Sequence, residues 1–367
     1  MSFLKKLFLK KEAKETPIQS YADFWNWFQI HEKDFFDVVK NGDYIEKGFF
    51  DKLGPKLDEL KEGYYYLTGM ENDDTAELII TAEGNLKNIV FVEELIATAP
   101  NLKNWKFTPL KPPLDIKDVN IAMAGYEFCG DNIYFYANEL LEYPDEIDIT
   151  IIHNDYNQDN RDQIVNGVYI FLDNYLGELN FITGIDEIRF IEKYKAEKEL
   201  VPISKLKDFL IWREKEFLEK YQGIRNDNGA GNYSLMEAKL QSGNMLLAVI
   251  NTDLLDWDSK GSHPWIAVLI VHFDAGNNGM PDDDTMALLE EIEDSVLANL
   301  KDFDGYINIG RQTADGTREI YFACKDFRKP SRIFFDIQKA YTDRIKIEYD
   351  IYKDKYWQSF ERFNTGY

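Results

Sequence analysis

Apolar residues recur at helical spacing and at strand spacing in successive segments of the chain. Ser20 is a candidate N-cap for a helix over residues 21–40, whose apolar stripe stops at Asn41-Gly42. A second helix is expected at 44–61, with a candidate kink at Gly54-Pro55. A hairpin, a helix and a strand complete the N-terminal part, and we expect them at 63–82, 87–98 and 105–108.

The middle of the chain is richer in strands. Three strand candidates follow one another between residues 119 and 154, and a helix over 163–175 comes after a loop rich in Asp and Asn. A strand at 186–192 and a lysine-rich helix over 204–220 complete this segment. The linker KPPLDIKD separates it from the N-terminal part, because its prolines interrupt both patterns.

The C-terminal part carries the clearest signals of where elements begin and end. Of its three first strand candidates, WIAVLIVHFD is apolar almost throughout, as in a central strand. Pro281 and the acids Asp282–Asp284 indicate a helix start, and the helix is expected over Thr285–Phe303. Asp315-Gly316 is the signal of a type I′ hairpin, after which we expect a helix at 331–342 and a strand at 344–353.

The expected acidic helix is amphipathic, and the hairpin after it is charged. The buried side of the helix is predicted to hold Leu288, Leu289, Ile292, Val296 and Leu300. Its opposite face carries Glu290, Glu291, Glu293 and Asp294. The hairpin carries Arg311, Arg318 and Glu319, and pairing across its two strands would explain these charges.

Two segments of the chain show the same order of elements. Residues 63–110 and 305–352 align without a gap, and both read as strand, turn, strand, helix, strand. This internal repeat predicts an α+β fold in which helices cover antiparallel sheets, in modules of ferredoxin-like or related type. We expect a basic tail over 1–16, an N-terminal α+β domain over 17–113, a middle α+β segment over 114–222 and a C-terminal domain over 223–367.

The charge balance narrows the classes of partner. Lys and Arg number 42 against 66 Asp and Glu, a formal net charge of −24. Such a surface repels phosphate backbones, so no nucleic acid is expected as a partner, and a basic protein suits it better. An acidity that serves only solubility is the alternative.

The two cysteines and the first residues of the chain indicate in which cellular compartment the protein is expected. Cys129 and Cys324 lie in aromatic strand patterns, and two buried free thiols fit a reducing, cytoplasmic setting. No apolar run is long enough to span a bilayer, so integral membrane association is not expected. The segment MSFLKKLFLKKEAKE predicts a short basic amphipathic helix, either a tail docked on the protein or a peripheral membrane contact.

The search for catalytic chemistry leaves few candidates. Nucleotide-binding glycine patterns, a nucleophile elbow and cysteine-based metal spacing are absent from the sequence, and we expect no cofactor. His272 and Asp274 alternate on one strand and precede Asp283, a set that could hold a metal, but a histidine at a strand end and helix-capping acids explain the set better. With Arg311, Arg318 and Glu319, His272 and Asp274 form the candidate functional cluster.

The C-terminal pattern resembles a known family. Gly279-Met280-Pro281, Asp283, the run LEEIED at 289–294, Gly310-Arg311, Asp315-Gly316 and Arg318-Glu319 resemble the bacterial domain-of-unknown-function family 695. More distantly, they resemble the ribonuclease E inhibitor family of RraB type, small α+β proteins that bind the nuclease. The resemblance covers about residues 225–367 and departs from the pattern at Ala323-Cys324, where an aromatic residue is usual. It implies a fold, and no activity.

These observations favour a non-enzymatic interaction or regulatory protein. Its acidic helix face, with Glu290, Glu291 and Asp294, would meet a basic protein partner. A nuclease inhibitor of RraB type is one alternative, implied by the resemblance alone. A metal-dependent hydrolase that uses His272 and Asp274 is the other.

Overall fold

The structure is a computed structural model that describes residues 17–224, 231–276 and 278–364. It has helices and several antiparallel sheets, as the sequence predicts for an α+β protein. The chain divides into two compact units, Met1–Glu83 with Val92–Pro109, and Gly84–Phe91 with Leu110–Tyr367. The basic tail expected over 1–16 lies outside the described residues.

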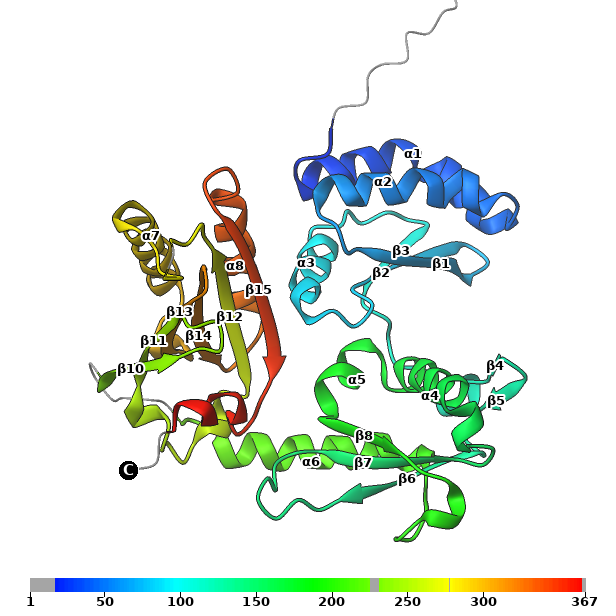
Figure 1. The fold of residues 1–367 in the computed structure, drawn as a ribbon. Coiled ribbons are helices and arrows are strands. Elements are labelled where there is room, and N and C mark those ends of the chain that lie inside the picture. The colour runs from blue at the N-terminus through cyan, green and yellow to red at the C-terminus, as the bar shows by residue number, and fades with distance from the viewer. Residues whose placement is uncertain (1–16, 225–230, 277, 365–367) are drawn as a thin grey trace, which may run out of the picture. The chain divides into compact units, whose positions relative to one another are not determined.

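The first unit is a small sheet with helices packed on it (Figure 1). Its elements are α1 (Tyr21–Asn41), the π-helical turn η1 (Glu46–Phe50), α2 (Asp51–Leu60), β1 (Tyr65–Asn72), β2 (Thr75–Thr81) and β3 (Trp105–Pro109), with strand order β1-β2-β3. The helix α3 (Leu86–Ala97) belongs to this unit from Val92 onward, and its first half belongs to the second unit. Ser20 caps α1 by accepting a hydrogen bond from the Asp23 backbone, as predicted. The second expected helix is interrupted by the π turn rather than at Pro55, which α2 contains.

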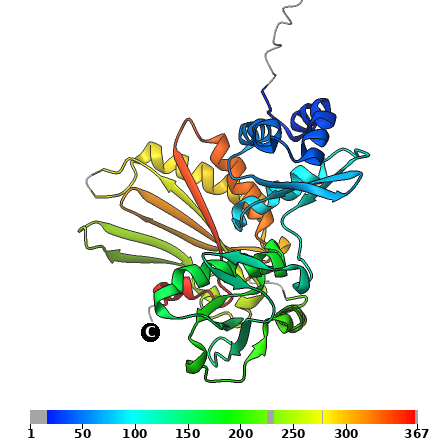
Figure 2. The same cartoon turned by 90° about the vertical axis from the view of Figure 1, so that its right-hand side faces the viewer.

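The middle segment forms a four-stranded sheet with helices packed on it (Figure 2). Its elements are β4 (Ile121–Met123), β5 (Tyr126–Phe128), β6 (Ile133–Asn138), β7 (Asp148–His153), α4 (Arg161–Leu176), α5 (Glu178–Gly184), β8 (Glu187–Phe190), β9 (Val201–Pro202) and α6 (Leu206–Tyr221). The order is β8-β7-β6-β9. Its core joins the buried side of β7 to α4 and to Leu206 and Leu210 of α6.

The C-terminal segment forms a six-stranded sheet. Its elements are β10 (Tyr233–Lys239), β11 (Met245–Asn251), β12 (Trp265–His272), α7 (Asp283–Asn299), β13 (Tyr306–Ala314), β14 (Thr317–Cys324), α8 (Arg328–Ala340), β15 (Lys346–Lys353) and the 3-10 helix η9 (Gln358–Phe363). The strand order is β10-β11-β13-β14-β12-β15. From β12 to β15 the order of elements and of strands is that of a ferredoxin-like module, which the β10–β11 hairpin extends along the β13 edge.

Different elements pack on the two faces of this sheet. On the helix face, Phe322 of β14 contacts Phe334 of α8, and Arg318 contacts Met286 of α7. On the other face, here called the tail face, Tyr321 packs against Phe360 and Phe363 of η9. Because side chains alternate along a strand, neighbours such as Arg318 and Glu319 point to opposite faces.

The internal repeat is visible in the element bounds. α3 begins at Leu86 and α8 at Arg328, 242 residues later, and the hairpins before them coincide in the same way. Gly63 and Gly305, which precede the two hairpins, both have a φ of 94°. The two copies of the repeat differ in strand pairing. In the first copy β3 pairs directly with β2, whereas in the second copy β12 lies between the corresponding strands β14 and β15. The first unit therefore resembles a ferredoxin-like module without its first strand.

A buried charge network joins the middle and C-terminal sheets within the second unit. Lys355 donates to the carbonyl oxygen of Asp145 at 2.6 Å and to Oδ2 of Asp186 at 2.7 Å. Burial lowers the pKa of Lys355 to about 8. Burial opposes ionisation of Asp186, but the charges of Lys353 and Lys355 outweigh it and hold the pKa of Asp186 below its usual value. The expected boundary at residues 222 and 223 lies inside this unit.

Several local expectations are corrected or refined. α7 begins at Asp283, with Asp282 as its N-cap, and it ends at Asn299 instead of reaching Phe303. Asp315 and Gly316 both have positive φ, at 46° and 77°, as the type I′ prediction requires.

Cys129 and Cys324 are free thiols, and Cys324 is buried whereas Cys129 is half-buried. In the described part of the chain, no helix is long and apolar enough to cross a membrane.

Candidate functional site

Two arginines of the β13–β14 hairpin meet one carboxylate from α7. Arg311 Nη1 lies 2.6 Å from Oε1 of Glu293, and Arg318 Nη1 lies 3.8 Å from Oε2 of the same residue. Arg318 Nε also donates to Thr313 Oγ1 at 3.0 Å. We call Glu293, Arg311, Thr313 and Arg318 the arginine cluster. The predicted pairing across the hairpin is wrong, because both arginines lie on the helix face and pair with α7.

The charged groups of this cluster are largely shielded from solvent. Arg318 is 3% exposed and Glu293 is 7% exposed. Arg318 Nη1 and Glu293 Oε2 are buried without a hydrogen-bond partner. Burial, and then the charge of Arg311, lower the pKa of Arg318, while Glu293 acts in the opposite direction. The cluster therefore fixes α7 against β13 and β14, and only Arg311 reaches its margin, with a side chain 36% exposed.

Within the part of the chain that the structure describes, no element covers the sheet beside the arginine cluster. The register places Leu235 of β10 opposite Val249 of β11, and Val249 opposite Arg311 of β13, so all three lie on the helix face. Exposed or half-exposed apolar side chains continue along this face of the two strands; we call them the open face: Tyr233, Leu235, Met245, Leu247 and Val249. Leu235 is 62% exposed and Tyr233 47%. β10 is also the edge strand of the sheet.

Exposed acidic residues lie on α7 and on β10, the edge strand that carries part of the open face. Glu290 and Asp294 are exposed on α7, and Glu237 is exposed on β10. Glu290 lies one turn before Glu293, on the side of α7 that reaches toward the arginine cluster. Glu291 points elsewhere, because its carboxylate pairs with Arg344 and accepts from Tyr341. Of the three predicted partner-binding acids, Glu290 and Asp294 remain exposed without such a pairing.

The other members of the predicted functional cluster lie elsewhere. His272 Nε2 contacts Oε2 of Glu348 at 2.9 Å, on the tail face. Glu319 shares that face and accepts hydrogen bonds from Gln312 and Tyr321. Asp274 follows the end of β12 in the loop toward α7. The structure thus brings Arg311 and Arg318 together and separates them from His272 and Glu319 by the sheet.

Two further kinds of chemistry, metal binding and nucleophilic catalysis, need side chains that lie close together. Among the described residues, no group of three or more His, Cys, Asp or Glu side chains could hold a metal ion. Ser262 Oγ and His263 Nδ1 lie 2.9 Å apart, a pair that the sequence did not reveal. Ser262 donates its proton to the Ser259 carbonyl at 2.6 Å, so His263 does not receive it. Burial lowers the pKa of His263 to about 3, which leaves a weak base.

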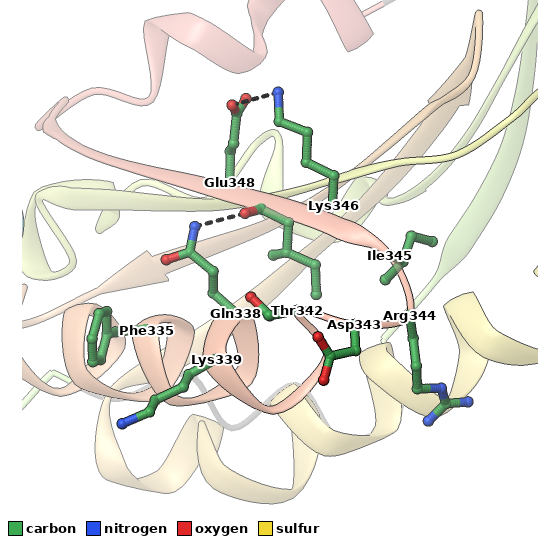
Figure 3. Close-up of a pocket in the computed structure, with 10 residues that line it drawn as sticks. Phe335, Gln338, Lys339, Thr342, Asp343, Arg344, Ile345, Lys346 and Glu348 are labelled. Atoms are coloured by element: carbon green, nitrogen blue, oxygen red, sulfur yellow. Dashed lines mark hydrogen bonds and ion pairs between the residues drawn. The ribbon is translucent and has the colours of Figure 1, made fainter. Parts of the chain in front are cut away.

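A hollow of about 670 Å³ lies where α8 turns into β15 (Figure 3). Three of its charged residues have partners within the protein, because Arg344 binds Glu291, and Lys346 lies 2.8 Å from Glu348. Lys339 and Asp343 also line the hollow. Gln338 Nε2 donates to the Ile347 carbonyl at 2.6 Å and closes one side. The hollow is therefore a mixed surface at the end of a helix, and part of its charge is already neutralised within the protein.

The turn and cap residues of the C-terminal pattern have structural roles. Asp282 caps α7, Gly310 follows a bulge in β13, and Asp315-Gly316 turns the hairpin. Residues 240–363 match the model of a family of unknown function, DUF695. The match includes the arginine cluster, β11 and the tail with Trp357, and it begins one residue after β10. Comparison with curated proteins and with solved structures gives no match. The more distant likeness to RraB-type inhibitors stays a prediction.

Glu293 is the residue of the DUF695 region that sequence reasoning misplaced. We expected it on the exposed face of the helix, and it is buried beside Leu289, Ile292 and Val296. The spacing does indicate the buried face, since position 293 is four residues after Leu289 and three before Val296, and such residues lie on the same side of a helix. Its partners lie on β13 and β14, and that pairing depends on how the helix crosses the sheet.

Proposed function

We propose that the protein is a non-enzymatic regulatory module that binds a partner protein through β10 and the open face. The observation that carries this proposal is the edge strand β10, whose outward side chains include the exposed Tyr233 and Leu235. An extended segment of a partner would add a strand to β10, and its alternate side chains would rest on the open face. Main-chain hydrogen bonds would supply affinity, and the apolar contacts specificity.

Charge indicates the chemistry of this partner. Glu237 of β10 lies opposite Leu247 of the open face, α7 carries the exposed Glu290 and Asp294, and the whole chain carries a formal charge of −24. A segment that alternates apolar residues with Lys or Arg complements both features. Arg311, already paired with Glu293, adds no unpaired positive charge to this surface. We place this function in the cytoplasm, where the free thiols of Cys129 and Cys324 would persist.

The arginine cluster has a supporting role in this proposal. It holds α7, which carries Glu290 and Asp294, at a fixed position above β13. Leu235, Val249 and Arg311 lie in one row across three strands, so the cluster and the open face are parts of one surface.

Affinity capture with matched variants tests the proposal. Tagged wild-type protein, Leu235→Asp and the control Ile30→Asp would be used as baits in lysate of the source cell. Ile30 is 79% exposed on α1, so its substitution introduces the same charge on an unrelated surface. We expect a protein captured by the wild type and by the control, with about tenfold less on Leu235→Asp, because a buried charge without a partner disrupts an apolar contact. Equal capture by all three baits would refute the proposal.

A further inference from the structure

A second hollow, of about 400 Å³, lies in the middle segment between α6 and the loop from β6 to β7. One wall is aromatic: the rings of Phe209 and Trp212, three residues apart on α6, have centroids 6.1 Å apart. Leu140 and Ile147 add apolar surface from the loop. Trp212 is 53% exposed, an unusual state for an indole that faces a hollow of this kind.

The opposite side of this hollow is acidic. Glu139, Glu146 and Asp148 line it. Asp148 already has a cationic partner, because Arg189 Nη2 lies 2.6 Å from Oδ2, and Asn138 donates to Oδ1 at 2.6 Å; Oδ2 itself is buried without a hydrogen-bond partner. Within the described residues, no cation lies within 4 Å of the carboxylates of Glu139 or Glu146. Glu146 accepts one hydrogen bond, from the uncharged amide of Gln358 at 2.9 Å.

Glu146 lies among like charges. It is half-buried, and burial followed by the neighbouring Asp186 raises its pKa; Asp354 and Asp148 act in the same direction, and Lys355 acts against them. A cation placed beside Glu146 would relieve this repulsion. The cation that lines the hollow, Arg213, is already engaged: it donates to the Pro144 carbonyl at 2.6 Å and pairs with Glu216 at 3.4 Å.

We propose that this hollow binds an organic ammonium ion with an apolar arm, whose charge pairs with Glu146 and whose arm packs on Phe209 and Trp212. The rings of Phe209 and Trp212 offer apolar surface to the arm, and a carboxylate in a partly desolvated setting strengthens its pairing with the charge. The volume suits a molecule of modest size, at the lower end of small-molecule pockets. This site is separate from the open face, so either proposal can fail while the other stands.

Fluorine NMR of the full-length chain tests the proposal. With 5-fluorotryptophan, the chain's seven Trp residues give separate probes, and Trp212→Phe identifies the signal of Trp212. Phenethylammonium would be titrated as the probe, against 2-phenylethanol, a neutral molecule of similar shape. We expect a saturable shift of the Trp212 signal with the ammonium ion, and an affinity about tenfold or more weaker for the alcohol.

Two variants identify the counter-ion. Glu146→Gln keeps a side-chain oxygen for Gln358 and should weaken phenethylammonium binding about tenfold or more. Glu142→Gln removes an exposed acid of the same loop that does not line the hollow, and it should leave the affinity unchanged. The absence of a saturable shift, equal affinity for the alcohol, or equal effects of the two variants would each overturn the proposal. A small free amine and the side chain of a lysine in a protein both carry an ammonium group on an apolar arm. Titration of a lysine-containing peptide under the same conditions shows which of the two binds more tightly than the other.

Discussion

Glu293 bridges two arginines from neighbouring strands, and one of them, Arg318, is 3% exposed. A buried ion pair contributes little compared with apolar packing, but removing one partner leaves a buried charge uncompensated. Glu293→Gln should therefore lower the free energy of unfolding by about 3 kcal/mol. The exposed neighbour variant Glu290→Gln should change it by less than about 0.5 kcal/mol. Urea unfolding of the full chain measures both, and equal stabilities would contradict the assigned role of Glu293.

His263 makes the stability of the protein depend on pH. Burial lowers its pKa from 6.5 to about 3 in the folded chain, so between these values the unfolded chain binds a proton that the folded chain does not. This contribution is complete above pH 6.5 and is lost as the pH falls toward 3, at up to about 1.4 kcal/mol per pH unit. His263→Gln should flatten the stability profile between pH 4 and 6. Parallel profiles of variant and wild type, from urea unfolding at each pH, would show that His263 is not the group.

The sequence predicted the roles of some single residues and missed those of others. Ser20 and Asp315-Gly316 were placed correctly, because a cap and a tight turn depend on a few adjacent residues. Glu293 was placed on the wrong face, and the Ser262–His263 pair was missed. Both depend on residues that only the folded chain brings into contact.

At the scale of elements, Gly310 controls how the open face attaches to the sheet. Its φ is 142°, and a Cβ there would lie 2.2 Å from the Val249 carbonyl oxygen and 2.9 Å from Ile250 Cα. Gly310→Ala should force β11 away from β13 and lower the melting temperature by several degrees, about 2–4 °C for each kcal/mol lost. Gly69→Ala is the matched control, because a Cβ on that strand glycine meets nothing within 4 Å.

Amide hydrogen exchange shows whether the effect is local. Gly310→Ala should speed exchange in β10 and β11 more than in β12, since among the described strands β10 pairs with β11 alone. Uniform acceleration across the sheet would contradict a local attachment role.

The order of elements was predictable where hairpins and helices follow one another directly. The repeat predicted β1, β2, α3 and β3 and their counterparts in the DUF695 region, since each boundary has local turn or cap chemistry. The sequence could not show that β12 separates β14 from β15, because strand order depends on long-range pairing. For the same reason it did not show that β10 is an uncovered edge.

At the scale of the whole molecule, the charge of −24 acts on association with a basic partner. Attraction between opposite charges raises the association rate, and salt screens it over about 8–10 Å at physiological ionic strength. The association rate with a captured partner should fall as salt is raised from 50 to 300 mM. Glu290→Lys combined with Asp294→Lys should reduce both the rate and its salt dependence. Surface plasmon resonance measures these rates, and a rate independent of salt would argue against a basic partner.

Site-specific photo-crosslinking in the source cell tests the docking surface most directly. A benzophenone amino acid would replace Leu235 on β10 in one strain and Ile30 on α1 in another; both side chains are exposed. The account predicts a discrete crosslinked partner from position 235, lost when Gly310→Ala is combined with it, and no such product from position 30. No adduct at position 235, or the same adducts from both positions, would contradict the claim that β10 and the open face bind a partner protein.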